Sequence, residues 1–479
     1  MSAQASRIRW NSLFAFLSQL IRLLTNFFLF VGIARFYGPE AFGQFTTAHT
    51  FSTIFLLFAD FGFDMLLTTE IARQRESAEQ LARTYYSLKL LFAFCAALAM
   101  FALSLVQSFT SETMLLIQIF SLYVLFSSLN NFFFALFKGV EQFQHETKIS
   151  FGINLLLLLL MIIGGIARVP LPIIALFFVG SRIIGLIIGA RIALRLTRFY
   201  PMSIDFTGWK DVWRLVSVFG LQYIFGNLFF ILDTVLLAFW NGDRDVSVYQ
   251  AAFKIVVLAL IIPDIVINTL MPMLSRVHGE SEERWDSLGR LLNKTLFLIG
   301  LPICMILFVY AEQIIEIVYG GRIFTEAVPI LRLFAFTVLV RFSVETYALM
   351  LTTSRRQTAR AMIVVGGTVV NFLMNLILIP KLGPYGAAIV SLATNIIVGT
   401  GYVIMAHNFI ARWRFDKRKI VPFVTTVILA LIIWQLRTIP LWYTGPVAIG
   451  IYALVFYFVG YTKDEWDMIF SRVKHASVI

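Results

Sequence analysis

The chain has 479 residues, of which 59% are hydrophobic and only 14% are charged, whereas a soluble globular protein carries about a quarter charged residues. So much apolar surface does not fit inside one water-soluble core, so lipid must be part of the solvent. The net charge of +12 would suit nucleic acid, but no basic tract stands on a soluble face, and no such partner is expected. Cys95 and Cys304 lie in apolar segments, so neither a disulfide framework nor a metal site is predicted.

Apolar segments long enough to cross a membrane, which takes about 20 residues, recur along the whole chain. In chain order the predicted spans are 11–34, 42–67, 85–107, 113–137, 149–167, 170–194, 213–238, 248–272, 291–310, 327–351, 359–379, 384–407, 420–436 and 445–461. The connections are short, and the first apolar helix follows basic residues without a cleavage site, so we expect a retained first span and no extramembrane domain. The prediction is an all-α integral membrane protein with about fourteen transmembrane helices.

The basic residues predict how these spans face. With the N-terminus in the cytoplasm, 27 of the 39 lysines and arginines fall in cytoplasmic connections and six fall in the opposite ones. This asymmetry is what the positive-inside rule requires, and a wrong number of spans would scramble it halfway along the chain. We therefore predict an even number of spans with both termini in the cytoplasm.

The chain also contains an internal repeat. A shift of 204 residues places Gly38 on Gly242, Phe45 on Tyr249, Ala48 on Ala252 and Asp60 on Asp264. Because six spans separate the copies, the repeats are parallel and related by a pseudo-two-fold axis along the membrane normal. This predicts two six-helix bundles, over 1–204 and 205–410, followed over 411–479 by two additional transmembrane helices and a cytoplasmic tail.

Three stretches resemble the polysaccharide transporter family. They are the loop ARFYGPEAFGQFTTA at 34–48, the glycine turn and helix VYGGRIFTEAVPILRLFAF at 318–336, and the turn IPKLGPYGAAIVSLATN at 379–395. All three stand at the expected places between spans, and together with the topology they cover nearly the whole chain. The chain therefore resembles the Wzx-type oligosaccharide flippases of the multidrug/oligosaccharidyl-lipid/polysaccharide exporter superfamily.

The resemblance implies a function and its setting. It implies a flippase in the bacterial inner membrane that moves an undecaprenyl-pyrophosphate-linked oligosaccharide repeat unit to the outer leaflet by alternating access, for O-antigen or exopolysaccharide synthesis. Its partners would be this lipid-linked substrate, membrane lipid, and the polysaccharide polymerase with its chain-length machinery. Coupling to a proton or sodium gradient is open, and no cofactor is expected.

Three other functions stay open beside this one. The lipid II flippases of the same superfamily have fourteen spans, whereas many Wzx-type members are described with twelve. A cation-coupled multidrug exporter would share the fold, although its cationic substrates would lie poorly among buried arginines. A membrane glycosyltransferase or polymerase usually has a long extramembrane loop or a surface acidic pair; here the outward loops are short and no catalytic motif is present, so we do not expect an enzyme.

A lipid-linked pyrophosphate needs a cationic path, and arginine suits phosphate oxygens. The candidate ligands within spans are Arg22, Arg182, Arg341, Lys254 and Arg332. The first three lie deepest by sequence position, and their alternative role is a structural ion pair between helices. For Lys254, Arg332 and also Lys89, the alternative is that the side chain reaches out to the lipid headgroups.

Acidic residues within spans are candidates for ion coupling or gating. They are Asp60, Asp64, Asp264 and Glu345. Asp60 and Asp64 are four residues apart, and two close carboxylates raise one another's pKa, which suits cation exchange; a solvated helix end is the alternative. Asp264 follows Pro263, where a helix bend is expected. Glu345 is placed to pair with Arg341 on one helix face, for structure or for gating.

Uncharged polar residues at four-residue spacing are candidate sugar contacts, with hydrogen bonding between helices as their commoner use. They are Asn371 with Asn375, and Tyr223 with Asn227. The aromatic runs FFFALF at 132–137 and NLFFIL at 227–232 are predicted to face lipid. His49, with no partner motif, is not predicted to bind metal.

Overall fold

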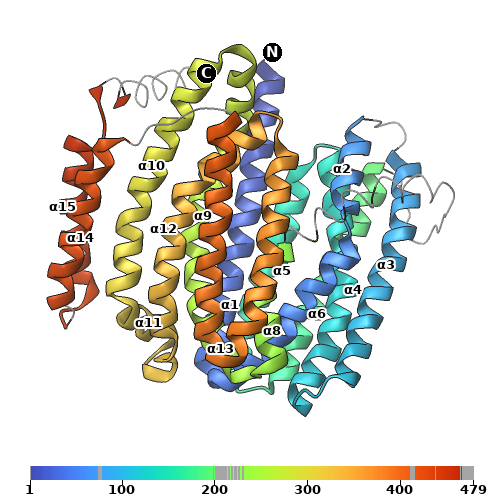
Figure 1. The fold of residues 1–479 in the computed structure, drawn as a ribbon. Coiled ribbons are helices and arrows are strands. Elements are labelled where there is room, and N and C mark those ends of the chain that lie inside the picture. The colour runs from blue at the N-terminus through green and yellow to red at the C-terminus, as the bar shows by residue number, and fades with distance from the viewer. Residues whose placement is uncertain are drawn as a thin grey trace. The chain divides into compact units, whose positions relative to one another are not determined.

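The computed structural model describes residues 2–73, 78–197, 231–409, 416–436 and 438–463, together with Glu465, Trp466 and single positions within 198–230. These residues form helices joined by turns, with no strand among them (Figure 1). The chain divides into two compact units, Met1–Gln250 and Ala251–Ile479, here called unit 1 and unit 2. The bundle boundaries predicted at 204/205 and 410/411 fall outside the described residues.

Unit 1 is built around one central helix. Its helices are α1 (Ser2–Asp60), α2 (Phe63–Arg73), α3 (Ala78–Val106), α4 (Ser111–Gly139), α5 (Phe143–Ile166), α6 (Leu171–Thr197), α8 (Leu232–Trp240) and the first residues of α9 (Asp243–Glu280). Helix α4 packs against α1, α2, α3, α5 and α6. An aromatic cluster fills the contact between α1, α4 and α6, where the His49 ring lies 5.0 Å from the Phe30 ring.

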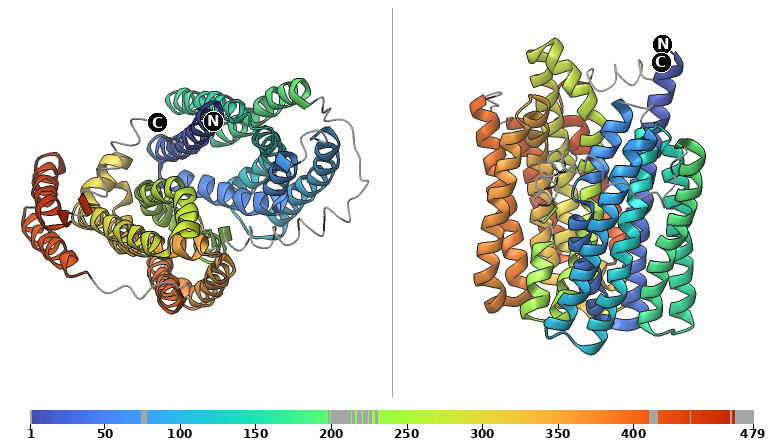
Figure 2. Two further views of the ribbon diagram at one scale, coloured as in Figure 1. Left: turned by 90° about the horizontal axis from the view of Figure 1, so that it is seen from above. Right: turned by 90° about the vertical axis from the view of Figure 1, so that its right-hand side faces the viewer.

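Unit 2 contains the rest of α9 and the helices to the C-terminus. They are α10 (Glu282–Val309), α11 (Ala311–Tyr319), η2 (Arg322–Phe324), α12 (Ala327–Thr353), α13 (Gln357–Phe409), η3 (Lys417–Lys419), α14 (Ile420–Gln435) and α15 (Leu441–Val459). Helix α12 packs between α10 and α13, and the last two helices, α14 and α15, pack together against α10. The views in Figure 2 show α14 and α15 side by side, coloured red.

The all-α membrane fold is confirmed. Eleven helices within the described residues are long and apolar enough to cross a membrane. Two of them, α1 with α2 and α13, hold two crossings each, because the backbone turns back within them. The described residues therefore hold thirteen crossings, eleven plus the second crossing of each of these two. The span predicted over 213–238 lies largely outside the described residues.

Both turns lie at glycines that the sequence marked. Gly38 has φ 85° and Gly383 has φ 55°, and each stands next to a proline between two helices. A residue with a Cβ atom rarely adopts a positive φ angle, whereas glycine adopts it without a steric clash. Gly242, the repeat partner of Gly38, has φ 87°. The internal repeat is therefore present in the backbone itself.

The structure differs from the prediction at the end of the second span. The expected helix over 42–67 breaks at Phe61 and Gly62, whose φ angles are 35° and 78°. Asp60 therefore ends α1 and Asp64 lies in the first turn of α2, so the two carboxylates do not follow one continuous helix. The aligned stretch of unit 2 has Val266 in place of Gly62 and stays helical, and a β-branched residue adopts the left-handed conformation far less readily than glycine.

The prediction that the run 132–137 faces lipid is wrong. Phe132, Phe133 and Phe137 are fully buried, and Phe134 is 4% exposed. These rings pack with residues of α2, α3 and α6, because α4 is surrounded by other helices. A helix that is apolar on every side gives no sequence signal of which face meets lipid. The run 227–232 lies largely outside the described residues.

Candidate functional site

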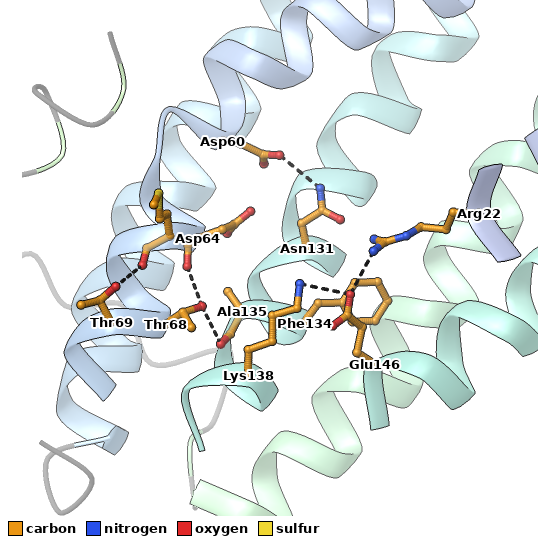
Figure 3. Close-up of a pocket in the computed structure, with 11 residues that line it drawn as sticks. Arg22, Asp60, Asp64, Thr68, Thr69, Asn131, Phe134, Ala135, Lys138 and Glu146 are labelled. Atoms are coloured by element: carbon orange, nitrogen blue, oxygen red, sulfur yellow. Dashed lines mark hydrogen bonds and ion pairs between the residues drawn. The ribbon is translucent and has the colours of Figure 1, made fainter. Parts of the chain in front are cut away.

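A charged cavity lies inside unit 1, near one end of α4 (Figure 3). Its volume is about 390 Å³. The residues that line it are Arg22, Asp60, Asp64, Met65, Thr68, Thr69, Asn131, Phe134, Ala135, Lys138 and Glu146. So many ionisable groups around one space, among otherwise apolar helices, mark a candidate functional site.

One wall of the cavity is a carboxylate held between two cations. Glu146 lies in the first turn of α5 and forms ion pairs with Arg22 of α1 and Lys138 of α4. The Arg22 Nη2 and Lys138 Nζ atoms both lie 3.2 Å from Glu146 Oε1. The Glu146 side chain is 1% exposed, whereas those of Arg22 and Lys138 are 40% and 34% exposed. Figure 3 shows both cationic side chains reaching Glu146 from different helices. This wall carries a net charge of +1.

The structure places the Arg22 side chain level with helix ends. It pairs with Glu146 in the first turn of α5, and Glu146 also pairs with Lys138 in the last turn of α4. The sixteen residues from Arg22 to the Gly38 turn span roughly 24 Å of helix at 1.5 Å per residue. Arg22 is therefore near one edge of the apolar layer, but it still lines the cavity.

The other wall holds the carboxylates of Asp60 and Asp64, which form a triad with one lysine that does not itself line the cavity. Lys89 of α3 lies 3.1 Å from Asp60 Oδ1 and also pairs with Asp64. Its side chain is fully buried, so the alternative that Lys89 reaches out to the headgroups is wrong. The break at Phe61 and Gly62 brings both carboxylates to this one ammonium group. The predicted carboxylate pair is thus a triad with net charge −1.

Asp60 is the most fully bonded member of the triad. Ser128 Oγ donates to Asp60 Oδ1 at 2.7 Å, and Asn131 Nδ2 donates to Oδ2 at 3.1 Å. Asp60 is 4% exposed, whereas the Asp64 side chain is 28% exposed. The alternative of a solvated helix end therefore does not hold for Asp60.

Arg182 of α6 is held by an aromatic ring. Its Cζ atom lies 5.4 Å from the centroid of the Tyr123 ring, a distance at which a cation is attracted to the ring face. Within the part of the chain that the structure describes, its Nε atom is buried without a hydrogen-bond partner. Arg182 does not line the cavity of Figure 3, and its role as a substrate ligand stays a prediction.

Unit 2 has its own charged cluster. The predicted Arg341–Glu345 pair is present, with Arg341 Nη2 3.5 Å from Glu345 Oε2. Arg360 of α13 approaches the other oxygen of Glu345 at 3.9 Å, and Asp264 interacts electrostatically with Arg341 and Glu345. Two arginines from α12 and α13 therefore share the Glu345 carboxylate, which the sequence did not indicate for Arg360.

The other predicted cations have different surroundings. The Cζ atom of Arg332 lies 4.9 Å from the centroid of the Trp434 ring, so this side chain packs between α12 and α14. Lys254 is partly buried in α9. Arg332 and Trp434 both lie near the ends of their helices, so the alternative in which Arg332 reaches out to the headgroups stays open. Substrate binding by Arg332 or Lys254 stays a prediction.

The amides predicted to contact sugars are used inside the protein. Asn371 and Asn375 are 1% and 0% exposed. Asn375 donates to Asn371 Oδ1 at 3.0 Å, and Asn371 donates to Thr394 Oγ1 at 3.4 Å. They join the two halves of α13, the commoner use of such residues, and do not offer their amides to a sugar here. Tyr223 lies outside the described residues, and Asn227 is partly buried.

Sequence reasoning missed Lys138 and Glu146 as site residues, and it missed the pairing of Lys89. Lys138 and Glu146 were assigned to a cytoplasmic connection, and the pairing of Glu146 with Arg22 joins residues more than a hundred positions apart. No group of three or more His, Cys, Asp and Glu side chains in the described ranges is arranged to hold a metal ion.

The fold and this cavity define a multi-pass membrane protein of the transporter kind. A family model described as polysaccharide biosynthesis protein matches residues 8–278, more than half of the chain, and the MatE family model matches residues 219–377. The chain belongs to the polysaccharide biosynthesis protein family, within the flippase group of the multidrug/oligosaccharidyl-lipid/polysaccharide exporter superfamily. A comparison with curated protein sequences finds no match.

Solved structures of this superfamily share the fold. The lipid II flippase MurJ in an inward closed conformation is 14% identical, with a TM-score of 0.74 over 97% of this chain and 99% of MurJ. An inward-facing multidrug resistance MATE family transporter is 15% identical, with a TM-score of 0.67 over 80% of this chain and 94% of its own. A Pyrococcus furiosus transporter, whose description reports a binding pocket of reverse polarity, has a TM-score of 0.58 at 15% identity and covers 84% and 96% of the two chains.

Proposed function

We propose that this chain is a flippase that carries a lipid-linked oligosaccharide on a polyprenyl pyrophosphate across the bacterial inner membrane, with both termini in the cytoplasm. The cavity of unit 1 is the observation that supports this most directly. Its Arg22–Lys138 wall is cationic, and the two side chains, which line the cavity, are 40% and 34% exposed. A cationic, accessible surface is what an anionic phosphate headgroup requires. The family of polysaccharide biosynthesis proteins agrees with a sugar-bearing cargo.

The other functions fit less well. A multidrug exporter of cations would meet the cationic wall, which repels its cargo. The family and the similar structures are transporters and flippases, not catalysts, so we propose that the chain is not an enzyme. Lipid II remains the second candidate cargo, because the MurJ structure matches the full chain including its C-terminal helices. The polysaccharide polymerase and its chain-length machinery are the proposed partners.

The role of the arginines can be measured directly. Replacing Arg22, Arg182 or Arg341 with alanine is expected to lower flipping of a lipid-linked oligosaccharide in proteoliposomes at least tenfold, because a hydrogen bond to a charged group contributes about 1.5–3 kcal/mol. Membrane insertion should be unchanged. Arg322→Ala is the matched control, since Arg322 is 80% exposed in a short turn. Normal flipping by all three variants would contradict the proposed cationic path.

Ion coupling is proposed through Asp60, Asp64 or Asp264, with Glu345 gating beside Asp264. An imposed proton or sodium gradient is then expected to accelerate flipping in proteoliposomes several-fold, and Asp60→Asn or Asp264→Asn should abolish the acceleration without abolishing gradient-independent flipping. The measurement compares initial rates with and without each gradient. Equal rates under both gradients would mean that these carboxylates serve structure alone.

A further inference from the structure

Lys138 and Glu146 are absent from the sequence-based set of ligands, yet they form the cationic wall together with Arg22. Within the described part of the chain, the two cations have donors that make no contact. Arg22 contacts Glu146 through one terminal nitrogen, although a guanidinium has five N–H groups and an ammonium has three. The two threonine hydroxyls that line the cavity are engaged as donors instead. Thr68 donates to the Asp64 and Ala135 carbonyls, and Thr69 donates to the Met65 carbonyl.

Glu146 is a loosely held partner for these cations. Both contacts are 3.2 Å long, whereas a charge-assisted N–H···O bond is usually about 2.7–2.9 Å. Both also fall on one oxygen. The second, Oε2, is buried and accepts no hydrogen bond from any residue that the structure describes. A buried carboxylate that uses half of its capacity does not fully compensate either cation.

The opposite wall directs an anion towards the same place. Asp60 and Asp64 share one ammonium group there, so that side of the cavity repels negative charge. Both oxygens of Asp60 are already occupied by Lys89, Ser128 and Asn131. Among the described residues that line the cavity, Arg22 and Lys138 are the cations that an anion there can meet.

From this geometry we infer that Arg22 and Lys138 bind the pyrophosphate of the lipid-linked cargo, and that Glu146 is an internal anion which occupies their site until the pyrophosphate displaces it. The inference rests on the proposed function and identifies the residues at one end of the path. The released Glu146 would stay beside the bound pyrophosphate and weaken its binding by repulsion. Glu146 is thus a positioning residue that limits affinity and allows release.

The signature of this arrangement is a pair of opposite effects. With the protein in phosphatidylcholine nanodiscs, Glu146→Gln is expected to bind farnesyl pyrophosphate about tenfold more tightly, a change of about 1.4 kcal/mol, whereas Arg22→Gln and Lys138→Gln bind it about tenfold more weakly. Binding is measured by titration calorimetry. Glu79→Gln is the matched control: it removes one carboxylate of unit 1, 40% exposed and paired with Arg83, and should leave the affinity unchanged.

Three outcomes would overturn the inference. If Glu146 serves structure alone, Glu146→Gln will lower the melting temperature without tightening binding, or all three variants will weaken it together. If the variants change the affinity for farnesol, which lacks the anion, as they change that for farnesyl pyrophosphate, the site does not recognise phosphate. If inorganic pyrophosphate binds as tightly as farnesyl pyrophosphate, the site takes a free anion and not a lipid headgroup.

Failure of the inference is distinguishable from failure of the proposed function. If the variants change the affinity in opposite directions but the protein does not flip a lipid-linked oligosaccharide, the anion site is supported and the proposed cargo is not. If the protein flips the lipid-linked oligosaccharide but the Glu146 and Lys138 variants do not change its affinity for farnesyl pyrophosphate, the proposed function holds and the pyrophosphate binds at another site. Lys138→Gln, whose side chain is one-third exposed, keeps the test valid should Glu146→Gln fail to fold.

Discussion

Replacing Lys89 with methionine is expected to destabilise unit 1 by about 3–5 kcal/mol, the effect of removing one partner from a buried ion pair. Methionine has nearly the same length, so packing is preserved and the loss is electrostatic. Lys89 is fully buried, and without it Asp60 and Asp64 face each other with no compensating charge. In detergent micelles the melting temperature should fall by roughly 10 °C.

A rescue variant separates charge from packing. Combining Lys89→Met with Asp60→Asn and Asp64→Asn removes all three charges, and a buried ionic group replaced as a whole by neutral residues is often as stable as before. Most of the lost stability should return. Lys148→Met, which removes an exposed lysine of α5 in the same unit, is the matched control. If Lys89→Met melts like the unchanged protein, the triad does not stabilise this fold.

The parts of the fold that sequence could predict are those determined locally. Length and hydropathy define the spans, because a crossing needs its own apolar residues. Gly38 and Gly383 could be recognised as turns, because the need for positive φ belongs to one residue and its neighbours. The 204-residue repeat followed from Gly38 and Gly242 for the same reason, and both glycines adopt nearly the same φ.

The parts that failed depend on which helices become neighbours. Lys89, judged by its place near a span end, was expected at the headgroups, but two carboxylates across a helix contact keep it buried. Arg22 and Glu146 are 124 residues apart, and nothing in either segment indicates the other. The phenylalanines of 132–137 could not be oriented, since a helix that is apolar all round carries no amphipathic signal.

The last two helices depend on a second buried lysine, Lys294 of α10. It is 2% exposed and lies 2.7 Å from Asp416 Oδ2 and 2.9 Å from Glu465 Oε2, residues that stand before α14 and after α15. Its ammonium also lies 5.4 Å from the centroid of the Tyr461 ring. One side chain of α10 thus holds both ends of the α14–α15 pair.

The titration of Asp416 agrees with this role. Burial raises the pKa of this carboxyl, but hydrogen bonds from Lys294 and from the Arg418 backbone, with the charges of Lys294 and Lys419, outweigh it, so the pKa is lowered. A carboxyl with a lowered pKa in the folded state stabilises it above the unfolded value of about 3.9 and loses that contribution as the pH falls further. The attachment is therefore expected to be constant from pH 8 to 5 and to weaken below about pH 4.

Lys294→Met is consequently expected to loosen α14 and α15 by about 3 kcal/mol, at the lower end of the range for a broken buried pair because both carboxylates are partly exposed. Amide hydrogen exchange in these two helices should become roughly a hundredfold faster, since local opening sets the exchange rate, while exchange in α4 stays unchanged. Lys417→Met, at an exposed position of η3, is the matched control. Unaltered exchange in α14 and α15 would mean that their apolar contacts with α10, such as those of Leu298 and Tyr452, hold them without Lys294.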